Sequence, residues 1–301
     1  MQMKQIFATA LFLATVHAVH AADAPETALC NQAMEQGNHA QALTHAEAAL
    51  KQNSKDREAL PCKGRALSDA GKYEPALAAM EAAQKISVAP IDRIVALTLT
   101  GNVQRDAKRY DAALASYRQS LAIAQAEQEK RFERINHNLI GETLITTNQL
   151  DAGLKSYLAG AELAANDTER ADNYSRIAQT YSSLGQYDQA VDYQIKTMLT
   201  EERSGDFNHY AYAALELGQL HMTAGNHAEA EKVLHKVIER SKAQGAQYWE
   251  ARGYYYLALE KTASGHQPEA KPLLTQAQQI SKQIGADELN KEITMAMNKA
   301  D

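Results

Sequence analysis

The sequence contains few residues that interrupt helices. Only 6 of its 301 residues are proline, 15 are glycine and 2 are cysteine. Alanine, leucine, glutamine, glutamate and lysine, which favour helices, are abundant instead. This composition predicts an all-α protein.

Long apolar runs and dense basic runs are also missing. Beyond the first 21 residues no apolar run reaches 18 residues, which excludes a polytopic membrane protein. The mean hydropathy is -0.46. The formal net charge is -6, and no window gathers the lysine and arginine that binding to a nucleic-acid backbone requires. The sequence therefore favours protein or peptide partners over nucleic acid.

The one apolar run near the start is typical of an export signal. Lys4 is the only charge before Asp23, and it precedes an apolar segment from Ile6 to Val16 that is too short to span a membrane. We predict that residues 1–21 are a signal peptide, cleaved after Ala21 with Ala22 as the competing site. Removing Lys4 gives the mature chain a net charge of -6 - 1 = -7. An amphipathic first helix is the alternative, but the segment has no polar face.

The exported chain is predicted to be soluble in the periplasm, with secretion as the second choice and no stable membrane insertion. Cys30 is preceded by Thr27, Ala28 and Leu29. A bacterial lipoprotein has leucine three residues before its cysteine and a small residue directly before it. The sequence therefore does not favour a lipid anchor.

One spacing recurs seven times. A turn residue is preceded, seven positions earlier, by a small residue, and another small residue follows five positions after the turn. The turn residues are Gly37, Gly71, Lys108, Asn148, Gly185, Gly225 and Gly265. The first small column is Cys30, Gly64, Gly101, Gly141, Ala178, Gly218 and Ala258. The second is Ala42, Ala76, Ala113, Gly153, Ala190, Ala230 and Ala270. We expect each copy to be two antiparallel helices that approach closely at their small residues, with the turn residue as a left-handed cap.

These columns resemble the tetratricopeptide repeat family, which also has an aromatic residue after the turn and another in the second helix. Tyr73, Tyr110 and Tyr187 match the first aromatic, and Tyr117 and Tyr157 match the second. The resemblance covers about 260 residues. It implies a right-handed superhelical solenoid that binds a protein or peptide in a concave groove, with no cofactor.

The predicted domain organisation follows the repeat. Seven helical hairpins occupy approximately residues 22–56, 57–92, 93–132, 133–169, 170–208, 209–248 and 249–286, and residues 287–301 form a capping helix. Successive turns are 34, 37, 40, 37, 40 and 40 residues apart, from subtraction of the turn positions. The later helices should therefore be longer, and Pro61 and Pro272 should shift a helix start or bend an axis.

The two cysteines allow two interpretations. Cys30 and Cys62 both lie on first helices of adjacent hairpins. In an oxidising compartment they are able to pair, provided that both side chains point inward between the facing helices; two buried thiols are the alternative. There is no Cys-x-x-Cys motif, which argues against redox catalysis.

No catalytic constellation is present in the sequence. It lacks HExxH, GxSxG, GxxxxGK[ST] and paired Cys-x-x-Cys motifs. Three of the ten histidines, His221, His227 and His235, are close in sequence but fall on different helix faces or in a turn. We interpret the histidines as solvated or packed helix residues and predict a protein that is not an enzyme and holds no metal.

The candidate binding residues are those that should face the groove. The position directly after the first small column holds Asn31, Arg65, Asn102, Glu142, Gln179, Gln219 and Leu259. Nearby candidates are Arg105, Asn138, Arg176, Arg252, Tyr255 and Tyr256. By resemblance, asparagine at such positions clasps the backbone of an extended peptide. The arginines form a basic thread through an acidic protein, which favours an anionic peptide. The alternative is a hydrated polar face without a dedicated ligand.

An aromatic cluster and the absence of a known peptide-binding motif also bear on the predicted site. Trp249 and Tyr254 to Tyr256 form the densest aromatic cluster. Tyr254 should lie in the core, whereas Tyr255 and Tyr256 should turn toward the inner face of the superhelix as an exposed pair. The lysine-bearing carboxylate clamp of chaperone-adaptor relatives is not reproduced, because Thr27 and Pro61 occupy the matching positions.

The leading hypothesis is a non-enzymatic interaction scaffold in the cell envelope. A ligand-responsive regulator is an alternative suggested by the lengthened repeats, although the predicted signal peptide opposes it. A self-associating structural protein is a second alternative, because the exposed edges of a solenoid are able to self-associate.

Overall fold

The computed structural model describes residues 25–300, and every regular element in this range is an α-helix, fifteen in all. The predicted signal peptide lies outside these residues. The chain divides into two compact units, one that ends at Thr143 and one that begins at Leu144. The all-α prediction is therefore confirmed for the described residues.

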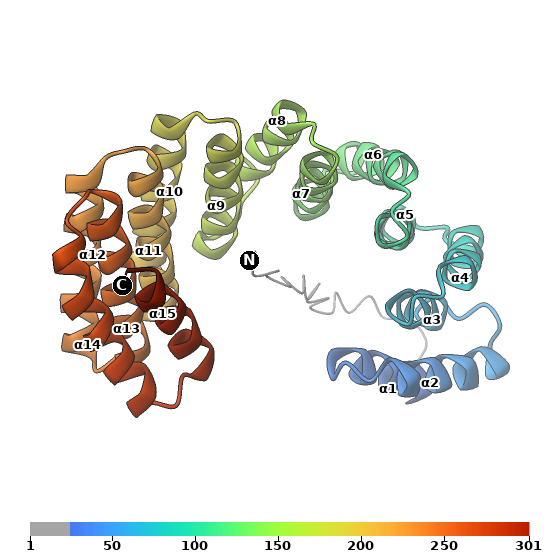
Figure 1. Ribbon diagram of the computed structural model, residues 1–301. Coiled ribbons are helices and arrows are strands. Elements are labelled where there is room, and N and C mark those ends of the chain that lie inside the picture. Colours follow the sequence, from blue (N-terminus) through green and yellow to red (C-terminus); the bar gives the residue numbers. More distant parts are fainter. Residues whose placement is uncertain (1–24, 301) are drawn as a thin grey trace. The chain divides into compact units, whose positions relative to one another are not determined.

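Unit 1 consists of three hairpins followed by a single helix. Its helices are α1 (Pro25–Glu35), α2 (His39–Gln52), α3 (Ala59–Asp69), α4 (Tyr73–Ile86), α5 (Pro90–Asp106), α6 (Tyr110–Ala126) and α7 (Lys130–Thr146), the last of which extends just past the division. Figure 1 shows α3 and α5 on one side of this unit and α4 and α6 on the other. Pro61 lies in the first turn of α3, where its missing N–H costs no helical hydrogen bond.

Unit 2 continues the array of hairpins and ends in a lone helix. Its helices are α8 (Leu150–Ala161), α9 (Asp167–Ser183), α10 (Tyr187–Ser204), α11 (Phe207–Thr223), α12 (His227–Gln244), α13 (Gln247–Ala263), α14 (Gln267–Gln283) and α15 (Asp287–Ala300). Helices α9 to α14 have 17 or 18 residues, whereas α1 to α4 have 11 to 14. Helices α5 to α7 already have 17 residues and α8 has 12. The predicted lengthening is therefore present, but it begins at α5 and not in the second half of the chain.

The seven predicted turns share one backbone geometry. All seven turn residues have positive φ, including the non-glycine Lys108 at 59° and Asn148 at 60°. In each turn the next amide donates to a carbonyl five residues earlier, as from Lys72 to Leu67 at 2.8 Å and from Gln186 to Tyr181 at 2.9 Å. This is the Schellman arrangement, in which the left-handed residue closes the helix that precedes it.

Within a hairpin, the glycines of the first small column make room for large side chains. A Cβ added to Gly101 would lie 2.4 Å from Cε1 of Tyr117, and one added to Gly64 would lie 2.5 Å from Cε of Met80. Likewise, a Cβ added to Gly218 would lie 2.8 Å from Cδ2 of Leu234. The sequence predicts contact between two small columns. The structure adds that the first column also accommodates the large residue sixteen positions later on the second helix.

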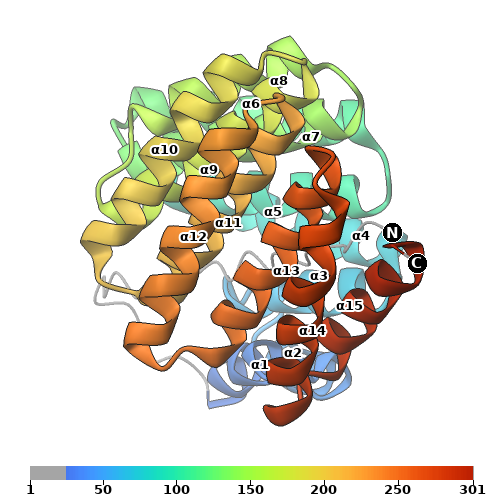
Figure 2. The ribbon, with the colours of Figure 1, turned by 60° about the vertical axis from the view of Figure 1, so that its left-hand side comes forward.

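The C-terminal helix docks on the last hairpin. Leu289 and Ile293 of α15 are buried in the same cluster as Leu257 and Leu274 of α13 and α14. In Figure 2, α15 lies beside α13 and α14. The apolar stripe of α15 therefore closes the core of the last hairpin, as the predicted capping role requires.

The two cysteines form a disulfide. Cys30 of α1 and Cys62 of α3 are bonded, and their side chains are 0% and 1% exposed. Of the two interpretations of these cysteines, the structure has the bonded one.

Candidate binding face

In each unit, the first helix of a hairpin packs mainly against the second helix of the preceding hairpin, as α3 does against α2 and α13 against α12, and it also contacts neighbouring first helices. Helix α3 packs against α1 and α5 in unit 1, and α13 packs against α11 and α15 in unit 2. We call the solvent-facing residues of these helices and of α7 and α9 the first-helix face, taken separately in each unit. All the predicted binding residues belong to helices of this face.

In unit 1, a predicted arginine and a predicted glutamate neutralise each other. Arg105 donates from Nη1 to Oε2 of Glu142 at 3.1 Å, and its Nη2 lies 3.5 Å from Oδ1 of Asp106. Asp106 also accepts a hydrogen bond from Ser68 at 3.3 Å. The positive charge of Arg105 is therefore compensated by residues of the same face.

The two predicted asparagines of the middle of unit 1 are partly engaged. The Oδ1 of Asn102 accepts a hydrogen bond from the Tyr117 hydroxyl at 2.8 Å, whereas its Nδ2 donates to no group within residues 25–300. The Oδ1 of Asn138 is buried and accepts no hydrogen bond in the same range. One amide donor and one amide acceptor thus remain unused, and these are the groups with which an asparagine pairs to a peptide backbone.

Arg65 differs from the other arginines of unit 1's first-helix face. Its side chain is half-buried on α3, next to the disulfide-bonded Cys62 in the same helix. Within residues 25–300 its guanidinium forms neither an ion pair nor a hydrogen bond. Burial lowers the pKa of Arg65, and the charges of Asp69 and Glu35 oppose that shift. Arginine remains protonated in proteins, so this face holds a partly desolvated cation without a contacting anion.

In unit 2, α9 is the first complete helix of the first-helix face. Arg176 donates from Nε to Asp172 at 3.1 Å and lies 5.8 Å from the ring centroid of Tyr157. Gln179 is exposed and Gln219 is half-buried. Leu259, the apolar member of the column, packs against the unit 2 core.

Arg252 on α13 is held between two tyrosines. It donates to the hydroxyl of Tyr248 at 3.1 Å and to that of Tyr256 at 2.9 Å, and it lies over both rings. No carboxylate among the described residues forms an ion pair with it. Tyr248, Arg252 and Tyr256 are spaced four residues apart, which places them on one face of the helix. This spacing is visible in the sequence, but the predicted site does not include Tyr248.

The predicted exposed pair of tyrosines is corrected by the structure. Tyr256 is only 8% exposed, like Tyr254, and both belong to the core of unit 2. Tyr255 is half-buried and reaches the surface. Tyr256 is buried because its ring packs in the core while its hydroxyl accepts from Arg252, so it positions the arginine rather than facing a ligand.

A carboxyl group that the sequence does not single out lies near Arg252. Burial raises the pKa of Glu216 on α11, while a hydrogen bond from Tyr212 and the charge of Arg252 oppose the rise. Glu216 forms no ion pair within the described part of the chain. The surroundings of Arg252 therefore combine a cation, a partly desolvated carboxyl and several tyrosines.

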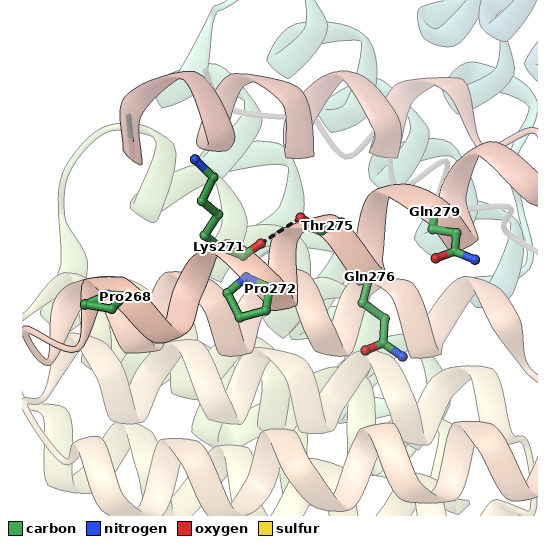
Figure 3. Close-up of a pocket in the computed structure, with 6 residues that line it drawn as sticks. All are labelled: Pro268, Lys271, Pro272, Thr275, Gln276 and Gln279. Atoms are coloured by element: carbon green, nitrogen blue, oxygen red, sulfur yellow. Dashed lines mark hydrogen bonds between the residues drawn. The ribbon is translucent and has the colours of Figure 1, made fainter.

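A surface pocket lies away from this face. Its lining residues are Pro268, Lys271, Pro272, Thr275, Gln276 and Gln279, all from the second helix α14 (Figure 3). The Thr275 hydroxyl donates to the Lys271 carbonyl at 3.0 Å. None of the predicted binding residues contributes to this pocket.

The described residues contain neither a cluster of metal ligands nor a helix able to span a membrane. Between residues 25 and 300, no three His, Cys, Asp or Glu side chains gather as a metal site would require. In the described range, no helix has both the length and the apolar character needed to cross a bilayer.

Comparison with known proteins identifies the family. Models of the tetratricopeptide repeat match residues 27–90 and 215–264, and a further one matches residues 171–196. No curated protein sequence matches the chain significantly. The chain is a member of the tetratricopeptide repeat family, as its repeated columns predict.

Solved structures of the same fold resemble the chain at low sequence identity. A signal transduction ATPase with numerous domains and a tetratricopeptide repeat sensor, from Pyrococcus horikoshii, is 15% identical with a TM-score of 0.70 over 89% of this chain and 44% of that one. This chain thus spans less than half the length of that protein. The C-terminal part of a repeat-containing protein from Cytophaga hutchinsonii is 12% identical, with a TM-score of 0.64 over 85% of this chain and 95% of that one.

A third structure, the apo form of RapI, is 11% identical, with a TM-score of 0.65 over 86% of this chain and 76% of that one. At these identities the likeness defines the fold. The tetratricopeptide repeat fold is that of protein–protein interaction scaffolds, whose stacked hairpins offer an extended surface to a partner.

Proposed function

We propose that the chain is an exported, non-enzymatic scaffold that binds a protein or an extended peptide on its first-helix face, in the periplasm. The family supports the scaffold role, and the pattern of residues 1–21 supports export. The bond between Cys30 and Cys62 adds independent support, because structural disulfides form and persist in oxidising compartments.

The observation that carries the binding proposal is the half-buried guanidinium of Arg65 without an ion pair. Desolvating a cation is unfavourable unless an anion pairs with it. A carboxylate from a partner would form a bidentate, charge-assisted pair with this planar group. The partner is therefore proposed to present an acidic side chain or a terminal carboxylate at Arg65.

The neighbouring amides fit an extended peptide. The unused Nδ2 of Asn102 is a donor and the unused Oδ1 of Asn138 is an acceptor. An extended backbone offers both complementary groups. Arg105 and Arg176 should contribute less to binding an anionic partner, because Glu142 and Asp172 already compensate their charges. The anionic preference is thus assigned to Arg65 rather than to a continuous basic thread.

Site-specific photo-crosslinking tests which face is used. A benzophenone amino acid is placed at Asn31, half-buried on α1 of unit 1, and as a control at Gln119, exposed on the second helix α6 of the same unit. We expect a partner to crosslink in native envelopes from position 31 and not from position 119. Equal crosslinking from both positions would contradict the proposed face.

The affinity of the captured partner then tests Arg65. We expect Arg65→Ala to weaken binding about 10- to 100-fold, the loss of one charge-assisted bidentate pair, as measured by isothermal titration calorimetry. Arg118→Ala, which removes an exposed arginine from the second helix α6, should leave the Kd within about twofold. Unchanged affinity of the Arg65 variant would contradict the proposed contact between Arg65 and a carboxylate of the partner.

A further inference from the structure

The disulfide ties together the two first helices that build the Arg65 region. Cys30 and Cys62 are 32 residues apart in sequence, and their sulfurs join α1 directly to α3. Asn31 follows Cys30, and Arg65 lies one helical turn after Cys62. The covalent link and the proposed binding residues therefore share the same two helices.

The core around this bond contains few large side chains. Its buried members are Cys30, Ala33, Met34, Ala42, Ala46, Cys62 and Ala66, with half-buried Leu43 beside them. The buried cluster of unit 2, in contrast, includes Tyr210, Leu234, Leu257 and Leu274. Hydrophobic stabilisation scales with the apolar area removed from water, and alanine contributes little of it. Leu43 and Leu50 of α2 also pack on the clusters that contain Leu67 and Leu60 of α3, whereas α1 contributes Cys30, Ala33 and Met34 to the cluster around the bond. Apolar packing thus holds α1 on α3 through few large side chains.

The polar contacts across the same junction are weak substitutes. His39 lies 3.1 Å from Asp69, and Lys63 lies 3.3 Å from Glu47, but these side chains are 30% to 51% exposed. Such pairs contribute little to stability in water. Both pairs join α2 to α3. Apart from the disulfide, α1 is held there by a hydrogen bond from Thr27 to Asp56 at 3.3 Å and by its packing on α2, so the covalent bond is the strongest direct link between α1 and α3.

The environment of Arg65 depends on that position. Glu35 of α1 acts on the Arg65 guanidinium through its charge, and burial of the guanidinium lowers its pKa. Undocking of α1 would remove Asn31 and Glu35 from the neighbourhood and hydrate the guanidinium. A hydrated arginine exchanges water for a carboxylate with little net gain.

From these contacts we infer that oxidation of Cys30 and Cys62 assembles the Arg65 part of the first-helix face, so that partner binding there requires the disulfide. The inference rests on the proposed function of that face. It makes the N-terminal binding region conditional on an oxidising compartment, whereas unit 2, which contains no cysteine, is independent of it.

The redox step is a thiol–disulfide exchange. A dithiol reductant breaks the S–S bond, and the two sulfurs receive two electrons and two protons to become thiols while the reductant becomes its own disulfide. Both sulfurs are buried, so the attacking thiolate reaches them only when the hairpin opens. The bond is therefore set once after export and does not toggle rapidly.

Hydrogen–deuterium exchange measured by mass spectrometry on the full chain tests the inference without any partner. We expect reduction of the wild type with a dithiol to raise the exchange rate of α1 and α2 at least about tenfold, as local opening costs less free energy. Exchange in α11 to α14 of unit 2 should not change. The Cys30→Ala/Cys62→Ala variant should match the reduced wild type, and the dithiol should have no further effect on it.

A chemical probe reports on Arg65 itself. Phenylglyoxal modifies accessible guanidinium groups, and we expect Arg65 to react faster in the reduced protein, with Arg118 on α6 as the unchanged control. Unaltered exchange of α1 and α2 on reduction would overturn the inference, as would equal loosening of unit 2. These readouts do not depend on the partner, so they can fail while Arg65→Ala still weakens binding, and they can succeed while that test fails.

Discussion

At the residue scale, the fold depends on size matching between positions sixteen residues apart. Where the first small column is glycine, a large side chain lies against it: Met80 at Gly64, Tyr117 at Gly101 and Leu234 at Gly218. Protein interiors are packed too tightly to absorb even one extra methyl group without a shift of neighbouring atoms. These glycines are therefore required by close approach.

Gly101→Ala tests this matching. The added Cβ would lie 2.4 Å from the buried Tyr117 ring, so we expect the substitution to lower the free energy of unfolding by about 1–3 kcal/mol, the usual cost of overpacking. Urea unfolding followed by far-UV circular dichroism measures it. Tyr117→Leu should cost less in the Gly101→Ala background than in the wild type, because the smaller side chain relieves the clash. A neutral Gly101→Ala would show that the helices separate freely at this point.

The contacts of individual side chains also explain why the binding residues were harder to predict than the fold. The column after the small residues identifies which side chains face outward, as at Arg65 and Gln179, because helical periodicity fixes direction. It does not identify which carboxylate reaches which arginine. Arg105 pairs with Glu142 of the next hairpin, 37 residues away, and such a contact depends on the packing of two hairpins. The burial of Tyr256 escaped prediction for the same reason.

At the element scale, α15 completes the core of the last hairpin. Ile293 is fully buried, whereas Met295 on the same helix is 57% exposed. The single tryptophan of the chain, Trp249, packs against the same cluster. Its fluorescence therefore reports on the unfolding of the unit 2 core that α15 completes.

Ile293→Ala should destabilise unit 2 by about 2–5 kcal/mol, because it leaves a cavity in a closed core. The measurement is the urea midpoint of Trp249 fluorescence. Met295→Ala is the matched control on the same helix and should change the free energy of unfolding by no more than about 0.5 kcal/mol. If both variants behaved alike, α15 would be a tail and not a cap.

The helices themselves were predictable because local signals agree with one another. The turn residues adopt positive φ at every predicted position, even where the residue is Lys108 or Asn148. The repeat made these turns predictable: a lysine alone does not indicate a left-handed turn, but Lys108 aligns with six other turn residues at the same position of the repeat. The pairing of glycine with a large residue sixteen positions later was missed because the large residues vary in type.

At the scale of the whole molecule, the main prediction concerns processing. If residues 1–21 direct export, the protein recovered from a Gram-negative periplasm should begin at Ala22, with Asp23 as the alternative start. Intact mass spectrometry distinguishes the two. Replacing Leu11 and Leu13 by aspartate should leave the chain uncleaved in the cytoplasm, because a charged segment cannot act as a signal-peptide core. Full-length protein in the periplasm would contradict the cleavage, and uncleaved wild type in the cytoplasm would contradict export.

The disulfide also fixes where such an array is able to grow. Repeat proteins lengthen by duplication of whole hairpins, because each hairpin contacts only its neighbours. A hairpin inserted between α2 and α3 would separate Cys30 from Cys62 and leave two thiols in the core. Insertion beyond α4 breaks no covalent bond and keeps each glycine with its large partner. We therefore expect relatives that retain both cysteines to carry no additional hairpin between the first two, so these two hairpins form one covalently fixed unit of the array.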